Sequence, residues 1–185
     1  MNTQWQPLET YDFSCLVAFL VGSQPNSCFK DAWEALINLP HWFHHGRYVE
    51  GWIVIEVASE VLVIEHAWCL LPDGKVVDPA IIFLIDRQQS VMYVPGVTYS
   101  WEETLAFEGE LLPRVREGGD GMQHPAYKAA YEAAWEAATT IARAADPPKK
   151  LTIYTAQAEP EGPQPAALVW IICRASSSQE PERGQ

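Results

Sequence analysis

Three residues of the types used in nucleophilic catalysis follow one another in the first half of the chain: Cys28, His66 and Asp78. In such catalysis a thiolate attacks a carbonyl carbon, a histidine moves the proton, and an acid orients the histidine. Cys28 follows Asn26 and Ser27, which are both good N-cap residues, so we expect it at the start of a helix. The free N–H groups and positive dipole end of a helix N-terminus favour a thiolate.

The spacing of the histidine and the aspartate fits two neighbouring strands. A turn at Pro72–Gly74 joins the predicted strands Val61–Leu71 and Lys75–Asp78. If the turn pairs the strand ends directly, Asp78 lies opposite Trp68 or nearby, one or two residues from His66. We therefore expect the two side chains to be close enough for contact.

These segments resemble the transglutaminase-like cysteine-enzyme superfamily. In that family an H-A-W segment is followed by a short turn and a strand ending in D-P-T, and here His66-Ala67-Trp68 is followed by Val77-Asp78-Pro79, with Ala80 in place of the threonine. Cys28 occupies the place of the family's nucleophile, and Tyr48–Trp52 fits its first core strand. The resemblance implies a papain-like core, in which a Cys-bearing helix packs on an antiparallel sheet. It also implies that Cys28 is the nucleophile, His66 the general base and acid, and Asp78 the group that orients His66.

A papain-type protease proper is disfavoured. Its local signature C-G-[SA]-C-[WY] is absent, and the interval of 38 residues between Cys28 and His66 is far shorter than in papain. An oxyanion hole is still required, and the backbone N–H of Cys28 is one natural donor. The Gln24 side-chain amide is the candidate for a second donor, with Asn26 as a rival; the alternative for Gln24 is a solvated turn residue.

The remaining pattern predicts an α+β fold in a single domain over residues 1–173, with a disordered tail over residues 174–185. The longest helical signal is the alanine-rich stretch Pro125–Ala144, where Tyr127, Tyr131 and Trp135 recur every four residues and favour a packing face. The other expected elements are a helix over Leu8–Val21, a second helix ending at Asn38, a His-rich loop over His41–Arg47, a strand over Tyr48–Val57, a short strand or buried turn over Ile81–Ile85, a short helix over Trp101–Phe107, a loop over Glu108–Gly121, and a C-terminal hairpin of Leu151–Thr155 with Leu168–Cys173.

Composition excludes several classes of function. The chain has 24 acidic and 12 basic residues, a formal net charge of -12, and no basic stripe, which disfavours nucleic acids and anionic membrane surfaces as partners. No run of 18 apolar residues is present, and the polar start Met1–Leu8 is not a secretory signal, so we expect a cytoplasmic protein. Cys15, Cys69 and Cys173 lie inside apolar runs and are expected to be buried hydrophobes.

No cofactor or metal is expected. Neither glycine-rich phosphate-binding motif occurs, and Gly118–Gly121 is interpreted as a flexible connector. His41, His44 and His45 lie close together, but Pro40 and Gly46 bracket them and a helix that would align two of them on one zinc ion is doubtful. We expect this segment to rim the cleft or pack on the sheet.

The sequence supports two hypotheses of different classes. The first is a thiol hydrolase or acyltransferase that acts on an amide bond in a peptide or protein substrate, with either water or an amine as acceptor. The second is a papain-like scaffold that has lost catalysis and serves as a binding or interaction module, with the aromatic stripe as its docking face. A Cys28 sulfur within about 4 Å of one His66 ring nitrogen, with Asp78 on the other, favours the enzyme. The substrate, the oligomeric state and the role of residues 80–173 do not follow from the sequence.

Overall fold

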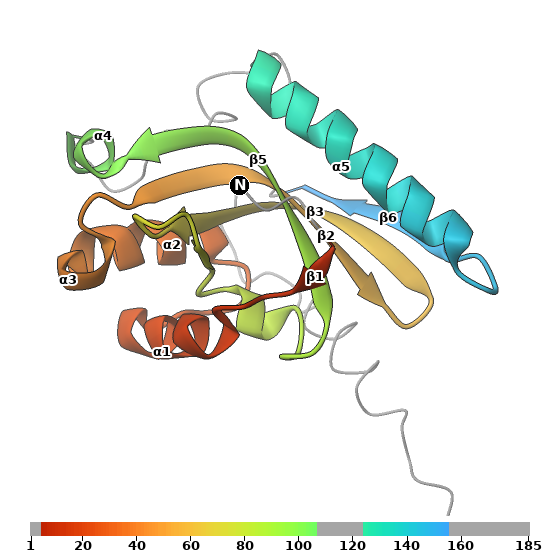
Figure 1. Ribbon diagram of the computed structural model, residues 1–185, viewed down its shortest axis with the longest axis horizontal. Coiled ribbons are helices and arrows are strands. Elements are labelled where there is room, and N and C mark those ends of the chain that lie inside the picture. Colours follow the sequence, from red (N-terminus) through yellow and green to blue (C-terminus); the bar gives the residue numbers. More distant parts are fainter. Residues whose placement is uncertain (1–4, 107–123, 156–185) are drawn as a thin grey trace, which may run out of the picture.

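Two long antiparallel strands, β2 (Arg47–Val57) and β3 (Glu60–Leu70), form the centre of the fold. The computed structural model describes residues 5–106 and 124–155 (Figure 1). Nearly every residue of both strands is buried, because helices or connecting segments cover both faces of the sheet. Double burial explains why these strands are almost continuously apolar instead of alternating with polar residues.

The complete sheet has six strands and is mixed. The order β1-β5-β2-β3-β4 is antiparallel at every step, and β6 pairs with β3 in parallel. The four further strands are β1 (Gln6–Pro7), β4 (Val76–Val77), β5 (Ser90–Ser100) and β6 (Lys150–Tyr154).

Helices lie on both sides of this sheet and at one end of it, as Figure 1 shows. Helix α5 covers one face through a cluster that contains Trp52 and Val54, and the start of α1 and the 3₁₀ helix η1 cover the other through a cluster that contains Val49 and Ile53. Helices α2 and α3 pack where β2 begins and β3 ends, and their cluster includes Tyr48. The helices are α1 (Tyr11–Val21), α2 (Cys28–Asn38), α3 (Pro40–Phe43), η1 (Ile81–Phe83), α4 (Trp101–Ala106) and α5 (Pro125–Ala144).

The alanine-rich sequence of helix α5 determines how closely the helix packs on the sheet. Its buried residues recur every three or four positions and are mostly alanines, which lets the helix axis approach the sheet closely: Tyr127, Ala130, Ala134, Ala138 and Ala142. The expected aromatic packing face is only partly realised. The Tyr127 ring is 2% exposed and its centroid lies 5.6 Å from that of the Trp52 ring, whereas Trp135, near the middle of the helix, is 39% exposed.

The structure confirms the α+β class and corrects several elements. The sheet is not purely antiparallel, because α5 carries the chain back across the sheet so that β6 enters alongside β3 in the same direction. The segment expected as a His-rich loop contains the short helix α3, which starts at Pro40. Of the two alternatives for Ile81–Ile85, the 3₁₀ helix η1 corresponds to the buried turn and not to the strand. Strand β5 has no counterpart in the sequence-based prediction.

Several predicted features lie outside the described residues: the loop at 108–121 with its glycine connector, the strand at 168–173 and the tail at 174–185. Within the described residues, none of the helices has both the length and the apolar character needed to cross a bilayer.

Candidate active site

The turn between α1 and α2 places Cys28 at the first position of α2. Helix α1 ends at Gly22, whose φ of +67° lies in the left-handed region that glycine adopts without strain. Asn26 takes a similar left-handed conformation, which asparagine tolerates better than most residues. Ser27 then serves as N-cap, as predicted, and the partly buried Cys28 opens the helix, where backbone N–H groups have no intrahelical partner.

A buried carboxylate holds this turn in place. Asp31, on the first turn of α2, is 2% exposed and accepts hydrogen bonds from the Ser23 hydroxyl and, at 2.7 Å, from the Ser27 hydroxyl. Burial raises the pKa of Asp31, although both hydroxyl donors act in the opposite direction. The Ser23 hydroxyl is also 3.3 Å from the carbonyl oxygen of Pro79, so the turn before Cys28 contacts the segment that follows Asp78.

The β3–β4 hairpin brings His66 and Asp78 together. Cys69 pairs with Val77 and Leu70 with Val76, so one further step places Asp78 level with Trp68, as the spacing predicted. The His66 Nε2 atom lies 2.8 Å from Asp78 Oδ2, and the two side chains are 2% and 0% exposed. The predicted contact between histidine and acid is therefore present in a nearly dry environment.

The Cys28 thiol meets the same imidazole. Cys28 interacts with His66 through its side chain and raises the pKa of the ring. Since Asp78 contacts Nε2, Nδ1 is the ring nitrogen left for the sulfur. Burial alone disfavours a charged ring, but Asp78 and Cys28 more than offset it and raise the pKa of His66 to about 10. The structure thus brings Cys28, His66 and Asp78 into one chain of contacts, with the imidazole in the middle.

The other two described thiols have different surroundings. Burial is the main reason that the pKa of Cys15 is raised, and Asp12 raises it further. Cys69 is fully buried, its thiol donates to the carbonyl oxygen of Ala32 at 3.0 Å, and burial raises its pKa. Cys69 is buried as expected, Cys15 is only partly buried, and Cys173 lies outside the described residues.

Gln24 does not reach the sulfur. Its side-chain amide is exposed and donates to the carbonyl oxygen of Gly22 at 3.2 Å, while its backbone N–H donates to Ser27 Oγ. This geometry corresponds to the alternative of a solvated turn residue. The backbone N–H of Cys28, at the open end of α2, remains the candidate oxyanion donor.

Two buried hydroxyl groups that the sequence did not single out complete the surroundings of Asp78. The Tyr93 hydroxyl, on β5, donates to Asp78 Oδ2 at 2.9 Å. The Asp78 backbone N–H donates to the Ser14 hydroxyl, on α1, at 3.0 Å. The only sequence signal for Tyr93 is the run of β-branched and aromatic residues over Ser90–Ser100, which Pro95-Gly96 interrupts in the manner of a turn.

The proline and glycine of β5 belong to an irregularity beside the site. The pairing of β2 with β5 shifts between Glu50 and Gly51, and Gly51 stands directly opposite His66 on β3. A Cβ on Gly51 would lie 2.4 Å from the carbonyl oxygen of Val94, so only glycine allows β5 to approach this closely.

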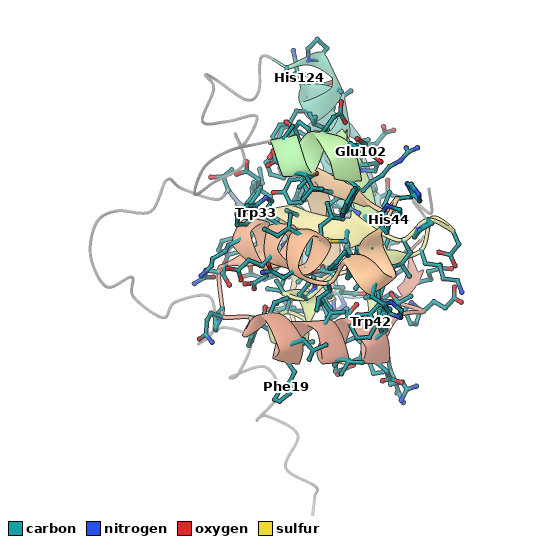
Figure 2. All side chains as sticks on the ribbon, turned by 90° about the vertical axis from the view of Figure 1, so that its left-hand side faces the viewer. Phe19, Trp33, Trp42, His44, Glu102 and His124 are labelled. Atoms are coloured by element: carbon teal, nitrogen blue, oxygen red, sulfur yellow. The ribbon has the colours of Figure 1, made fainter. Side chains whose placement is uncertain are left out.

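The neighbouring histidines pack on aromatic rings and on each other. The His44 ring makes an edge contact with Trp101 at 4.8 Å, and the His45 Nδ1 atom is 3.6 Å from Glu102 Oε1. Figure 2 shows His44 and Glu102 on the same side of this end of the molecule. Over the described residues, no group of three or more His, Cys, Asp or Glu side chains is arranged to hold a metal ion.

No protein-family model, curated protein or solved structure matches this chain.

Proposed function

We propose that the chain is a thiol hydrolase or acyltransferase that acts on an amide bond in a peptide or protein. The observation that carries this proposal is the contact of the His66 imidazole with the Cys28 thiol on one side and with Asp78 Oδ2, at 2.8 Å, on the other. Nucleophilic catalysis by a thiol requires this combination of nucleophile, base and orienting acid. A histidine on a scaffold without catalysis has no need of both contacts.

The proposed reaction proceeds in two steps. The Cys28 thiol gives its proton to His66, and the sulfur forms a bond to the substrate carbonyl carbon while charge develops on the carbonyl oxygen. The backbone N–H of Cys28 donates to that oxygen, and the His66 imidazolium gives its proton to the leaving amine as the amide C–N bond breaks. Water or a second amine then loses a proton to His66 and attacks the thioester, which releases the acyl group and restores the thiol.

The high pKa of His66 suits this cycle. An imidazolium whose pKa is about 10 is the majority form at neutral pH, so it places a positive charge beside the Cys28 sulfur and carries the proton that the leaving amine needs. Asp78 supplies the charge that keeps the buried ring protonated, because burial alone has the opposite effect.

We also propose that the core is transglutaminase-like within the papain-like group. Support comes from the order Cys, His, Asp, from the start of α2 at Cys28, and from the β3–β4 register that brings Asp78 to His66. The parallel strand β6 and the alanine at position 80 depart from the pattern of the resemblance.

The test measures formation of a thioester on Cys28. Purified protein is mixed with p-nitrophenyl acetate, the burst of p-nitrophenolate is followed, and the acylated residue is located by mass spectrometry. We expect a burst with acetyl on Cys28 in the wild type, none in Cys28→Ala, and a strongly reduced burst in His66→Ala. The matched control Cys15→Ala, which removes another partly buried thiol, is expected to keep the burst.

Adding a primary alkylamine then distinguishes the acceptors, since an acyltransferase forms the acetamide and a hydrolase forms acetate. A wild-type protein that gives no burst, and in which Cys28 is the slowest of the thiols to react with iodoacetamide, contradicts the proposal.

A further inference from the structure

The Asp78 carboxylate is saturated with hydrogen bonds. Its Oδ1 atom accepts the backbone N–H groups of Ala80 at 3.0 Å and Ile81 at 3.1 Å. Its Oδ2 atom accepts from the ring of His66 at 2.8 Å and from the hydroxyl of Tyr93 at 2.9 Å. The carboxylate is fully buried, so these four donors replace water around it.

Two donors of different kinds share the oxygen that faces the imidazole. Tyr93 is 4% exposed, and its ring makes an edge contact with Trp68 at 5.0 Å, which fixes the direction of the hydroxyl. Burial and the neighbouring Asp78 raise the pKa of Tyr93 well above its usual value, so the hydroxyl keeps its proton and stays a donor. A hydroxyl that donates to Oδ2 holds the carboxylate in its rotamer and also draws charge away from the atom that His66 contacts.

We propose that Tyr93 is a positioning residue of the active site, which fixes Asp78 toward His66 and moderates how strongly the carboxylate holds the imidazole proton. This inference rests on the proposed function, because only a catalytic imidazole has to release its proton to a leaving group. Without the hydroxyl, Oδ2 carries more charge toward the ring, and His66 becomes a weaker acid. The amine leaving group then receives its proton more slowly.

Few titratable groups face His66 and Asp78 among the described residues. His66 is faced by Asp78, which directly follows β4, and by Cys28 from α2. Asp78 is faced in addition by Tyr93 from β5 and, through charge, by Cys69 from β3. A shift in the titration of His66 on removal of the Tyr93 hydroxyl therefore reports the contact at Oδ2.

The chain offers a matched control for removing a tyrosine hydroxyl. Tyr11 packs against the same core cluster as Tyr93, and its hydroxyl donates to the carbonyl oxygen of Ile85 at 3.1 Å. Tyr11→Phe therefore removes a tyrosine hydroxyl, with its contacts to Ile85 and Cys15, from the same cluster without touching Asp78. A role of Tyr93 that is only structural would make the two variants alike.

The experiment compares Tyr93→Phe and Tyr11→Phe in the full chain by NMR titration of the ¹⁵N-labelled imidazoles and by the rate of acylation of Cys28. We expect the midpoint of His66 to rise in Tyr93→Phe and to stay at the wild-type value in Tyr11→Phe. We expect acylation by a p-nitroanilide, whose leaving group needs a proton, to fall about tenfold in Tyr93→Phe, the size associated with one hydrogen bond to a charged group. Alkylation of Cys28 by iodoacetamide needs no proton transfer to a leaving group, so it should change little.

A second variant keeps the test decisive if Tyr93→Phe does not fold. Fluorotyrosine at position 93 keeps the shape and is a stronger donor, so the His66 midpoint should move down instead of up. Equal His66 midpoints in the wild type and in these Tyr93 variants overturn the inference. A wild-type Cys28 that is neither acylated nor alkylated overturns the proposed function instead, so the two failures are distinguishable.

Discussion

Replacing Asp78 by asparagine tests the electrostatics of the site most directly. Asparagine is close to aspartate in shape, and its carbonyl oxygen can still accept the two backbone N–H groups that now contact Oδ1. The change places an NH₂ group where Oδ2 receives His66. That group donates to Nε2, which forces the ring proton onto Nδ1, the nitrogen that faces Cys28. The imidazole can then no longer take the thiol proton.

The structure also sets the size of the effect. The pKa of His66 rises from 6.5 to about 10 in the fold, which corresponds to about 5 kcal/mol in favour of the imidazolium. Burial opposes this rise, so in Asp78→Asn we expect the His66 pKa to fall below 6.5 and the imidazolium to be absent at neutral pH. An ordinary thiol with a pKa of about 8.5 is about 0.3% thiolate at pH 6. Asp78→Asn removes the positive charge beside the Cys28 sulfur, so we expect alkylation of Cys28 at pH 6 to become slower by a factor on the order of 10².

The assay is alkylation by iodoacetamide between pH 5 and pH 9, read by mass spectrometry at Cys28. The matched control is Asp73→Asn, which removes the same charge from the exposed turn of the same hairpin. We expect the control to follow the wild type at every pH. Equal rates at pH 6 in the wild type and Asp78→Asn, with both proteins folded, would refute the reasoning that Asp78 sets the ionisation of this site.

The same substitution predicts a change in the pH dependence of stability. A histidine whose folded pKa lies above its unfolded value stabilises the fold fully below pH 6.5, and this contribution disappears as the pH rises toward about 10. The difference in unfolding free energy between the wild type and Asp78→Asn should therefore shrink over this window. Urea denaturation at pH 6, 8 and 10 measures it, and a difference that grows with pH has the wrong sign for this explanation.

Three further outcomes follow from the packing. Burial raises the pKa of the Cys15 and Cys69 thiols, so both should react with iodoacetamide more slowly than Cys28 at pH 7, and Cys69 should react only after unfolding. Site-resolved mass spectrometry measures these rates. Fast labelling of Cys69 in the native protein would count against its burial. Gly51→Ala should lower the free energy of unfolding by about 2 kcal/mol or more, because its Cβ would lie 2.4 Å from a backbone oxygen of β5. An unchanged midpoint of urea unfolding would show that the backbone of β5 can move away at little cost in free energy. Tyr127→Ala should lower the free energy of unfolding by about 3–5 kcal/mol and Trp135→Ala by much less, since their side chains are 2% and 39% exposed. Equal losses in thermal unfolding would contradict the view that Tyr127 belongs to the face of α5 that packs on the sheet and Trp135 does not.

Local signals made the histidine–acid pair predictable from the sequence. His66 and Asp78 are twelve residues apart on strands joined by a tight turn, so the length of the turn limits the register to one or two choices. The position of Cys28 followed from the cap residues and the turn before it. Each of these inferences needs only a short stretch of chain.

The groups that support the pair were not predictable, because they come from distant parts of the chain. Ser14 is 64 residues from Asp78, and the strand that carries Tyr93 pairs with β2 around an irregularity that looks like a turn in the sequence. In the sequence, Pro95-Gly96 interrupts the run of strand-forming residues. Only the structure shows that β5 continues through this dipeptide, because the backbone there lies directly against Gly51 of β2. The expected oxyanion role of Gln24 depended on a side-chain direction that spacing does not determine.

Helix α1 connects both halves of the site without contributing a nucleophile, base or acid. Its buried Ser14 accepts the backbone N–H of Asp78, and the turn at its end carries Ser23, which donates to Asp31 beneath Cys28 and lies 3.3 Å from the carbonyl oxygen of Pro79. The position of Cys28 relative to Asp78 thus depends on how α1 sits on the sheet. The opposite side of the same helix carries an exposed Phe19, which projects away from the molecule in Figure 2. Substitutions on the inner side of α1 should therefore reduce acylation of Cys28 before they unfold the protein, whereas those on the outer side should leave both unchanged.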